Sequence, residues 1–61
     1  MMIPRMQIVW AVLEAAKDAG DDTIVSVCRG LIEADRRGWR KYHCPADYRL
    51  VTAFYEMSRE G

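Results

Sequence analysis

The sequence of 61 residues has little of the side-chain chemistry that catalysis requires. It contains one histidine, His43, which stands directly beside Cys44. Neighbouring side chains point in different directions, so these two do not form a nucleophile–base pair. Ser26 and Ser58 have no candidate base near them, and a chain this short has no room for a cleft of ordinary substrate size. We therefore predict that the protein is not an enzyme and has no catalytic residues.

Motifs for metal and phosphate binding are also missing from the sequence. Cys28, His43 and Cys44 supply thiol and imidazole groups, but no two of them have the spacing of a zinc site. Asp21 and Asp22 lack the alternating carboxylates and the glycine of a calcium loop. The four glycines are scattered and form no phosphate-binding loop. We expect neither a metal nor a cofactor.

The chain has no excess of either charge, with nine basic and nine acidic residues. A dedicated nucleic-acid-binding domain normally carries a basic excess, because phosphate neutralisation dominates its affinity. The apolar run from Ile8 to Leu13 is too short for a signal core or a membrane span, and Glu14 ends it. We therefore expect a cytoplasmic protein with reduced thiols, and keep a Cys28–Cys44 disulfide as the minor alternative.

Three segments have the composition and the apolar spacing of helices, and two breaks separate them. Residues 4–19 begin at a proline and are followed by Gly20, residues 23–37 are followed by Gly38, and residues 45–59 begin at Pro45. The short connection at residues 20–22 makes the first two helices antiparallel neighbours. The prediction is one all-α domain over residues 1–61, a helical hairpin with a third helix.

The first helix has an unusually wide apolar face. Its polar residues share an arc of roughly 100°, which leaves about 200° apolar, whereas packing on one neighbour needs little more than about 100°. One explanation places this helix at the centre of a three-helix monomer. The explanation that we prefer is a homodimer, because 51% hydrophobic content is more than a small monomer easily buries. The predicted dimer interface consists of Ile8, Val9, Val12, Ala15, Ala16 and Ala19.

Apolar spacing also predicts the buried faces of the other two helices. In the second helix, the apolar stripe consists of Ile24, Val27, Cys28, Leu31 and Ala34, with Val25 and Ile32 at its edge. In the third helix, the main stripe consists of Leu50, Ala53, Phe54 and Met57, flanked by Tyr48, Val51 and Tyr55.

Two residues of the second helix are unusual for their positions. Gly30 interrupts the helix at a cost of about 1 kcal/mol relative to alanine, which predicts close packing of another helix against it. Asp35 projects near the apolar stripe, where an unpaired carboxylate is expensive. We expect it to reach solvent or to pair with an arginine such as Arg5 or Arg49.

Residues 36–43 combine positive charge with aromatic side chains and contain no acid. The predicted contact residues are Arg36, Arg37, Trp39, Arg40, Lys41 and Tyr42. Trp, Tyr and Arg dominate the binding energy of protein interfaces, whereas basic residues with a stacking aromatic ring also suit single-stranded nucleic acid. A structural role is the third interpretation, in which Trp39 and Tyr42 cap the small core and the charges face water.

Small size, neutral charge, helical content and the lack of catalytic motifs together resemble small phage- or plasmid-encoded accessory proteins. The resemblance implies a non-catalytic protein-interaction module that binds a host protein and inhibits or modulates it. The alternative function is a small regulator that binds DNA or RNA through residues 36–43.

Overall fold

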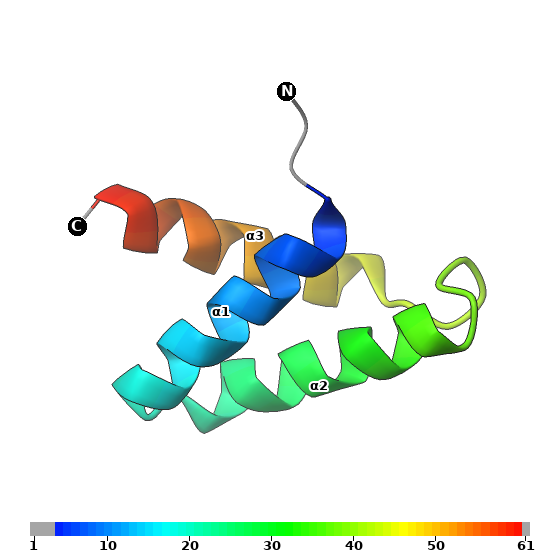
Figure 1. Cartoon of the computed structure of the whole chain (residues 1–61), viewed down its shortest axis with the longest axis horizontal. Coiled ribbons are helices and arrows are strands. Elements are labelled where there is room, and N and C mark those ends of the chain that lie inside the picture. The colour runs from blue at the N-terminus through cyan, green and yellow to red at the C-terminus, as the bar shows by residue number, and fades with distance from the viewer. Residues whose placement is uncertain (1–3, 61) are drawn as a thin grey trace.

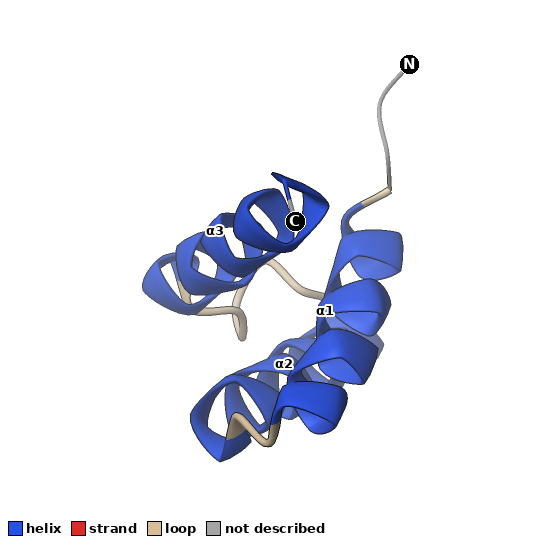
Figure 2. Cartoon of the chain, turned by 90° about the vertical axis from the view of Figure 1, so that its left-hand side faces the viewer, coloured by secondary structure: helices blue, strands red, loops and turns tan. Residues whose placement is uncertain are grey.

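The computed structural model describes residues 4–60, which form three helices and no strand. They are α1 (Arg5–Ala19), α2 (Asp22–Arg36) and α3 (Pro45–Glu60). The all-α prediction is confirmed, with helix bounds that differ from the predicted ones by one residue. α1 and α2 form an antiparallel hairpin, and α3 begins near the end of the hairpin that lies away from its turn (Figure 1). A view from the end of the molecule shows α3 to one side of the hairpin (Figure 2).

The turn between α1 and α2 uses two consecutive residues to end one helix and begin the next. Gly20 adopts the left-handed conformation, with φ of 73°, which glycine tolerates because it has no Cβ. The Asp21 N–H donates to the Ala16 carbonyl at 2.9 Å, and the Asp21 carboxylate accepts the Ile24 N–H at 3.2 Å. The local sequence thus determines the hairpin, because Gly20 supplies the reversal and Asp21 caps the N-terminus of α2.

The core lies between all three helices of one chain. Its fully enclosed side chains are Val9, Val12, Leu13, Cys28, Leu31 and Val51. α1 contacts both α2 and α3, so two neighbours within the same chain account for its wide apolar face. This is the three-helix arrangement that the sequence analysis ranked second.

The predicted dimer interface on α1 needs correction for that reason. Val9, Val12 and Ala16 are between 0% and 1% exposed within one chain, so they have no surface left for a second copy. Ile8 and Ala15 are half-buried, and Ala19 is exposed at the hairpin turn. Ala16 is thus covered by neighbours of its own chain.

The predicted buried face of α3 is correct for Phe54 and for the flanking residues, which pack against the core, but wrong for Leu50 and Met57. Val51 is fully buried, with Tyr48 and Tyr55 half-buried beside it, whereas Leu50 is 49% and Met57 is 74% exposed. Two neighbouring stripes of α3 are apolar, and only one can face the hairpin. Three aromatic residues, Tyr48, Phe54 and Tyr55, pack against the core, and each ring buries more area than leucine or methionine, which favours this side of α3 for the interior.

Gly30 also differs from the prediction. A Cβ built at this position meets nothing within 4 Å, so no helix packs against it. The residue lies on the exposed side of α2.

No helix within residues 4–60 has the length and apolar character needed to cross a membrane.

Candidate functional site

The connection between α2 and α3 reverses the chain through two residues with positive φ. Gly38 has φ of 117° and Trp39 has φ of 64°. The Trp39 N–H donates to the Ala34 carbonyl at 2.6 Å, and the Arg40 N–H donates to the Gly38 carbonyl at 2.7 Å. A left-handed backbone costs an L-residue such as tryptophan roughly 1–2 kcal/mol, so contacts of the Trp39 side chain must offset this cost.

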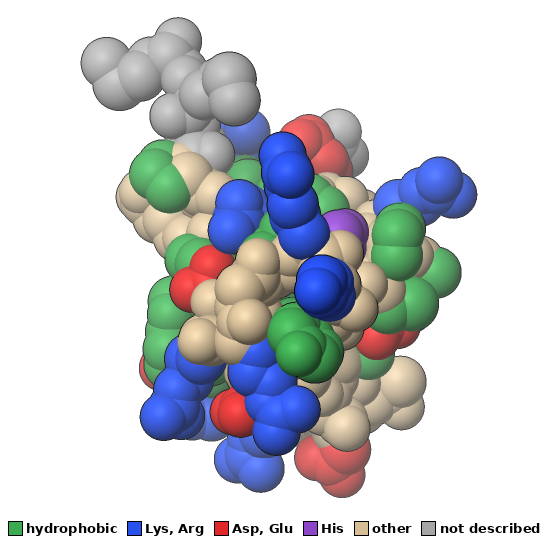
Figure 3. Space-filling model, turned by 90° about the vertical axis from the view of Figure 1, so that its right-hand side faces the viewer, with side chains coloured by type: hydrophobic (Ala, Val, Ile, Leu, Met, Phe, Trp, Pro, Cys, Tyr) green, Lys and Arg blue, Asp and Glu red, His purple; other side chains and the backbone are tan. Residues whose placement is uncertain are grey.

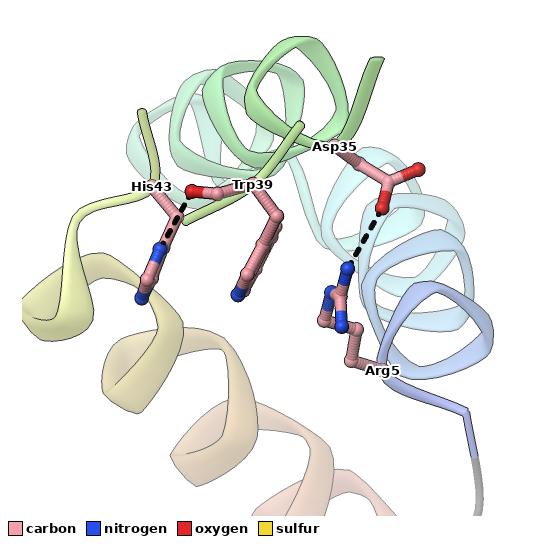
Figure 4. Close-up of polar contacts among 4 residues, drawn as sticks. All are labelled: Arg5, Asp35, Trp39 and His43. Atoms are coloured by element: carbon pink, nitrogen blue, oxygen red, sulfur yellow. Dashed lines mark hydrogen bonds and ion pairs between the residues drawn. The ribbon is translucent and has the colours of Figure 1, made fainter. Parts of the chain in front are cut away.

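The Trp39 ring lies between His43 and Arg5 (Figure 4). It stacks on the His43 ring with centroids 4.5 Å apart and planes inclined by 5°, and the Arg5 guanidinium lies 4.3 Å from its centroid. Tyr48 of α3 adds an edge-to-face contact at 5.6 Å. Trp39 thus joins the start of α1 to the start of α3. This packing corresponds to the structural role that was considered for Trp39 from the sequence.

His43 holds the connection in shape. Its Nδ1 lies 2.8 Å from the Trp39 carbonyl oxygen, which also accepts the backbone N–H groups of Tyr42 and His43 at 3.0 and 2.9 Å. A carbonyl oxygen only accepts, so Nδ1 carries the proton. The imidazole is therefore committed to a structural hydrogen bond and to stacking.

Arg5 pairs with Asp35 at 3.2 Å, as one of the predicted alternatives required (Figure 4). Both side chains remain partly accessible, at 44% and 35%, so the ion pair contributes at most about 1 kcal/mol. Its larger effect is positional, because the same guanidinium covers Trp39. The pair links the start of α1 to the end of α2.

A surface pocket of about 310 Å³ lies on the outer side of this connection. It is lined by Arg37, Gly38, Arg40, Lys41 and Tyr42, and is called the basic pocket below. Tyr42 is 54% exposed, with the Arg37 guanidinium 5.7 Å from its ring centroid. Figure 3 faces this end of the molecule and shows basic side chains spread over its surface.

The cations around the basic pocket differ in whether an acidic side chain pairs with them. Glu33 lies 3.8 Å from Arg36 and 3.5 Å from Arg37, so one carboxylate is shared between two guanidinium groups. Arg40 and Lys41 form no ion pair within residues 4–60. These two side chains carry the uncompensated charge of the pocket.

The structure brings four of the six predicted contact residues together: Arg37, Arg40, Lys41 and Tyr42 all line the basic pocket. Arg36 is exposed but does not line it, and Trp39 turns toward the core. The sequence analysis did not predict that Glu33 pairs with Arg36 and Arg37. The spacing of Glu33 three and four residues before Arg36 and Arg37 was the available signal for their compensation.

The two cysteines lie outside the basic pocket and differ in burial. Cys28 is a free, buried thiol, and burial raises its pKa because the thiolate loses solvation. Cys44 is free and exposed. The described part of the chain holds no group of three or more His, Cys, Asp or Glu side chains arranged to bind a metal.

Comparisons with protein-family models, curated proteins and solved structures give no match to this chain. The class of protein is therefore defined by its geometry, as a three-helix domain with a basic pocket beside an exposed tyrosine.

Proposed function

We propose that this protein is a non-catalytic interaction module that binds an acidic segment of another protein in the basic pocket. The observation that carries the proposal is the pair of uncompensated cations, Arg40 and Lys41, beside the exposed ring of Tyr42. Arginine binds carboxylates through two parallel hydrogen bonds, and an exposed tyrosine supplies rigid apolar area.

An acidic protein segment fits this surface better than a nucleic acid does. Of the two aromatic rings in the segment, Trp39 is stacked between His43 and Arg5 and offers no free face for a base. Two unpaired cations correspond to the release of about two counterions, which supports only weak binding to nucleic acid.

In this proposal the chain acts as a small accessory protein in the cytoplasm and inhibits or modulates the partner that it binds. Its small size and zero net charge support such a role. The binding surface is local, and the rest of the molecule has no strong electrostatic field. The partner contributes aspartate or glutamate side chains next to an apolar residue that packs on Tyr42.

The test compares two fluorescent probes, a short peptide of alternating glutamate and tyrosine and a short single-stranded oligothymidine, by anisotropy at low and moderate salt. We expect the peptide to bind the wild-type protein, and the Arg40→Ala, Lys41→Ala double variant to bind it about tenfold more weakly, because charge-assisted hydrogen bonds are lost. The matched control is Lys17→Ala, Arg29→Ala, which removes the same charge from exposed positions on α1 and α2. This control should bind like the wild-type protein.

Tighter binding of the oligonucleotide, lost in the Arg40→Ala, Lys41→Ala variant and steeply dependent on salt, would replace the proposal with the nucleic-acid alternative. Equal losses in the pocket variant and in the control would mean that net charge alone drives binding, and this result would also overturn the proposal.

A further inference from the structure

The exposed stripe on α3 has the spacing of a helix–helix seam. It consists of Ala46, Leu50, Ala53 and Met57, and all four side chains are exposed. The intervals between them are four, three and four residues, which is the spacing of alternating a and d positions in a heptad. Leu50 and Met57 leave 49% and 74% of their surface uncovered, so the stripe is apolar and has no partner among residues 4–60.

Two opposite charges flank this seam on one side. Arg49 and Glu56 each stand one residue before a large seam residue, Leu50 and Met57, and therefore occupy equivalent g positions one heptad apart. Both are exposed, and neither forms an ion pair in the part of the chain that the structure describes. At seven residues, about 10.5 Å along the helix, they are too far apart to pair with each other.

We infer that the seam binds a second copy of this chain, with the two α3 helices antiparallel. In that arrangement each large seam residue meets a small one: Leu50 lies opposite Ala53 of the second copy, and Met57 lies opposite its Ala46. A two-fold axis repeats each contact, as an isologous interface requires. Large residues against small ones let the two layers interdigitate.

The flanking charges select the second copy and the antiparallel direction. Antiparallel pairing places g positions opposite each other, so Arg49 of each copy faces Glu56 of the other and two ion pairs form. Parallel pairing places g positions opposite e positions, which leaves both Arg49 and Glu56 without a charged partner, whereas antiparallel pairing leaves only Asp47, at an e position, unpaired. The stripe is thus complementary in charge and in size to its own reversed copy.

This association is independent of the proposed function. The seam shares no residue with the basic pocket. A contact of four residues from each helix is small, so association depends on protein concentration. It also differs from the predicted α1 dimer, whose central residues are in the core.

Sedimentation velocity and light scattering over a concentration series up to about 1 mM test the inference. We expect the wild-type protein to shift from monomer to dimer, and Arg49→Glu alone and Glu56→Arg alone to remain monomeric, because each variant places like charges together. A mixture of the two single variants should associate, since every cross pair is then opposite in sign. The double variant Arg49→Glu, Glu56→Arg should recover dimerisation of its own.

Matched controls are Arg29→Glu and Glu14→Arg, alone and mixed, which change net charge equally at exposed positions on α2 and α1. They should dimerise like the wild-type protein, with helicity unchanged by circular dichroism in every variant. A wild-type monomer throughout the series would overturn the inference. So would a dimer that persists unchanged in Leu50→Lys, or one that Arg49→Glu leaves intact.

Discussion

At the scale of single residues, Trp39 shows how backbone geometry assigns roles within a mixed segment. Its left-handed conformation turns the ring inward, where Arg5 and His43 cover its faces. Tyr42, three residues later, remains on the surface beside Arg37. Composition alone does not distinguish Trp39 from Tyr42. The chain reversal at Gly38 and Trp39 makes Trp39 a packing residue and leaves Tyr42 as a candidate contact residue.

The two thiols should differ in reactivity at this same scale. Burial raises the pKa of Cys28, so near neutral pH less of it is thiolate, and its sulfur is also inaccessible to reagent. Cys44 is exposed. We expect Ellman's reagent to modify one thiol rapidly in the native protein and both in guanidinium chloride. Cys44→Ser should abolish the rapid reaction, and a rapid reaction that survives this change would show that Cys28 is accessible.

At the scale of elements, α2 contains a glycine that no contact requires. Gly30 lies in the helix interior and faces open space. The helix therefore bears the entropic cost of glycine without a packing gain from close approach. By contrast, Gly20 occupies a left-handed position, where a side chain is strained even though space is available.

The same substitution should consequently have opposite effects at these two glycines. We expect Gly30→Ala to raise the free energy of unfolding by about 1 kcal/mol, through helix propensity. Gly20→Ala should lower it by roughly 1–2 kcal/mol, because alanine disfavours the left-handed conformation. Urea unfolding followed by circular dichroism measures both changes. A loss of stability in Gly30→Ala would contradict the open environment of that residue.

At the scale of the whole molecule, stability depends on a core shared by three short helices. A domain of 61 residues has a free energy of unfolding on the order of 3–9 kcal/mol. Leu31, at the centre of the core, is 1% exposed, whereas Leu50 is 49% exposed on the outer face of α3. Truncating either leucine removes the same atoms from very different surroundings.

We expect Leu31→Ala to cost about 2–5 kcal/mol, enough to unfold much of the population, because it removes buried contacts and leaves a cavity. Leu50→Ala should cost roughly 0.5 kcal/mol or less. Thermal unfolding at low protein concentration, where association does not contribute, compares the two variants. Equal losses in both would contradict the observed orientation of α3.

The sequence by itself determined the helical class, the helix bounds to within one residue and the turn at Gly20 and Asp21, because these depend on contacts among near neighbours. It also included the Arg5–Asp35 pair among its alternatives, since a carboxylate near an apolar stripe needs a cation. Periodicity identified a main apolar stripe with apolar flanks on α3 and a wide apolar face on α1, but not which neighbours cover them.

Only the tertiary structure decided which apolar surfaces are interior. Val9 and Val12 meet neighbours of their own chain, and α3 buries Val51 while leaving Leu50 exposed. The physical reason is that apolar spacing is a property of one helix, whereas burial depends on the area that several helices cover together. The candidate site follows the same rule in part, because one face of the Trp39 ring is covered by Arg5 of α1, which lies far away in the sequence, while Tyr42 stays exposed.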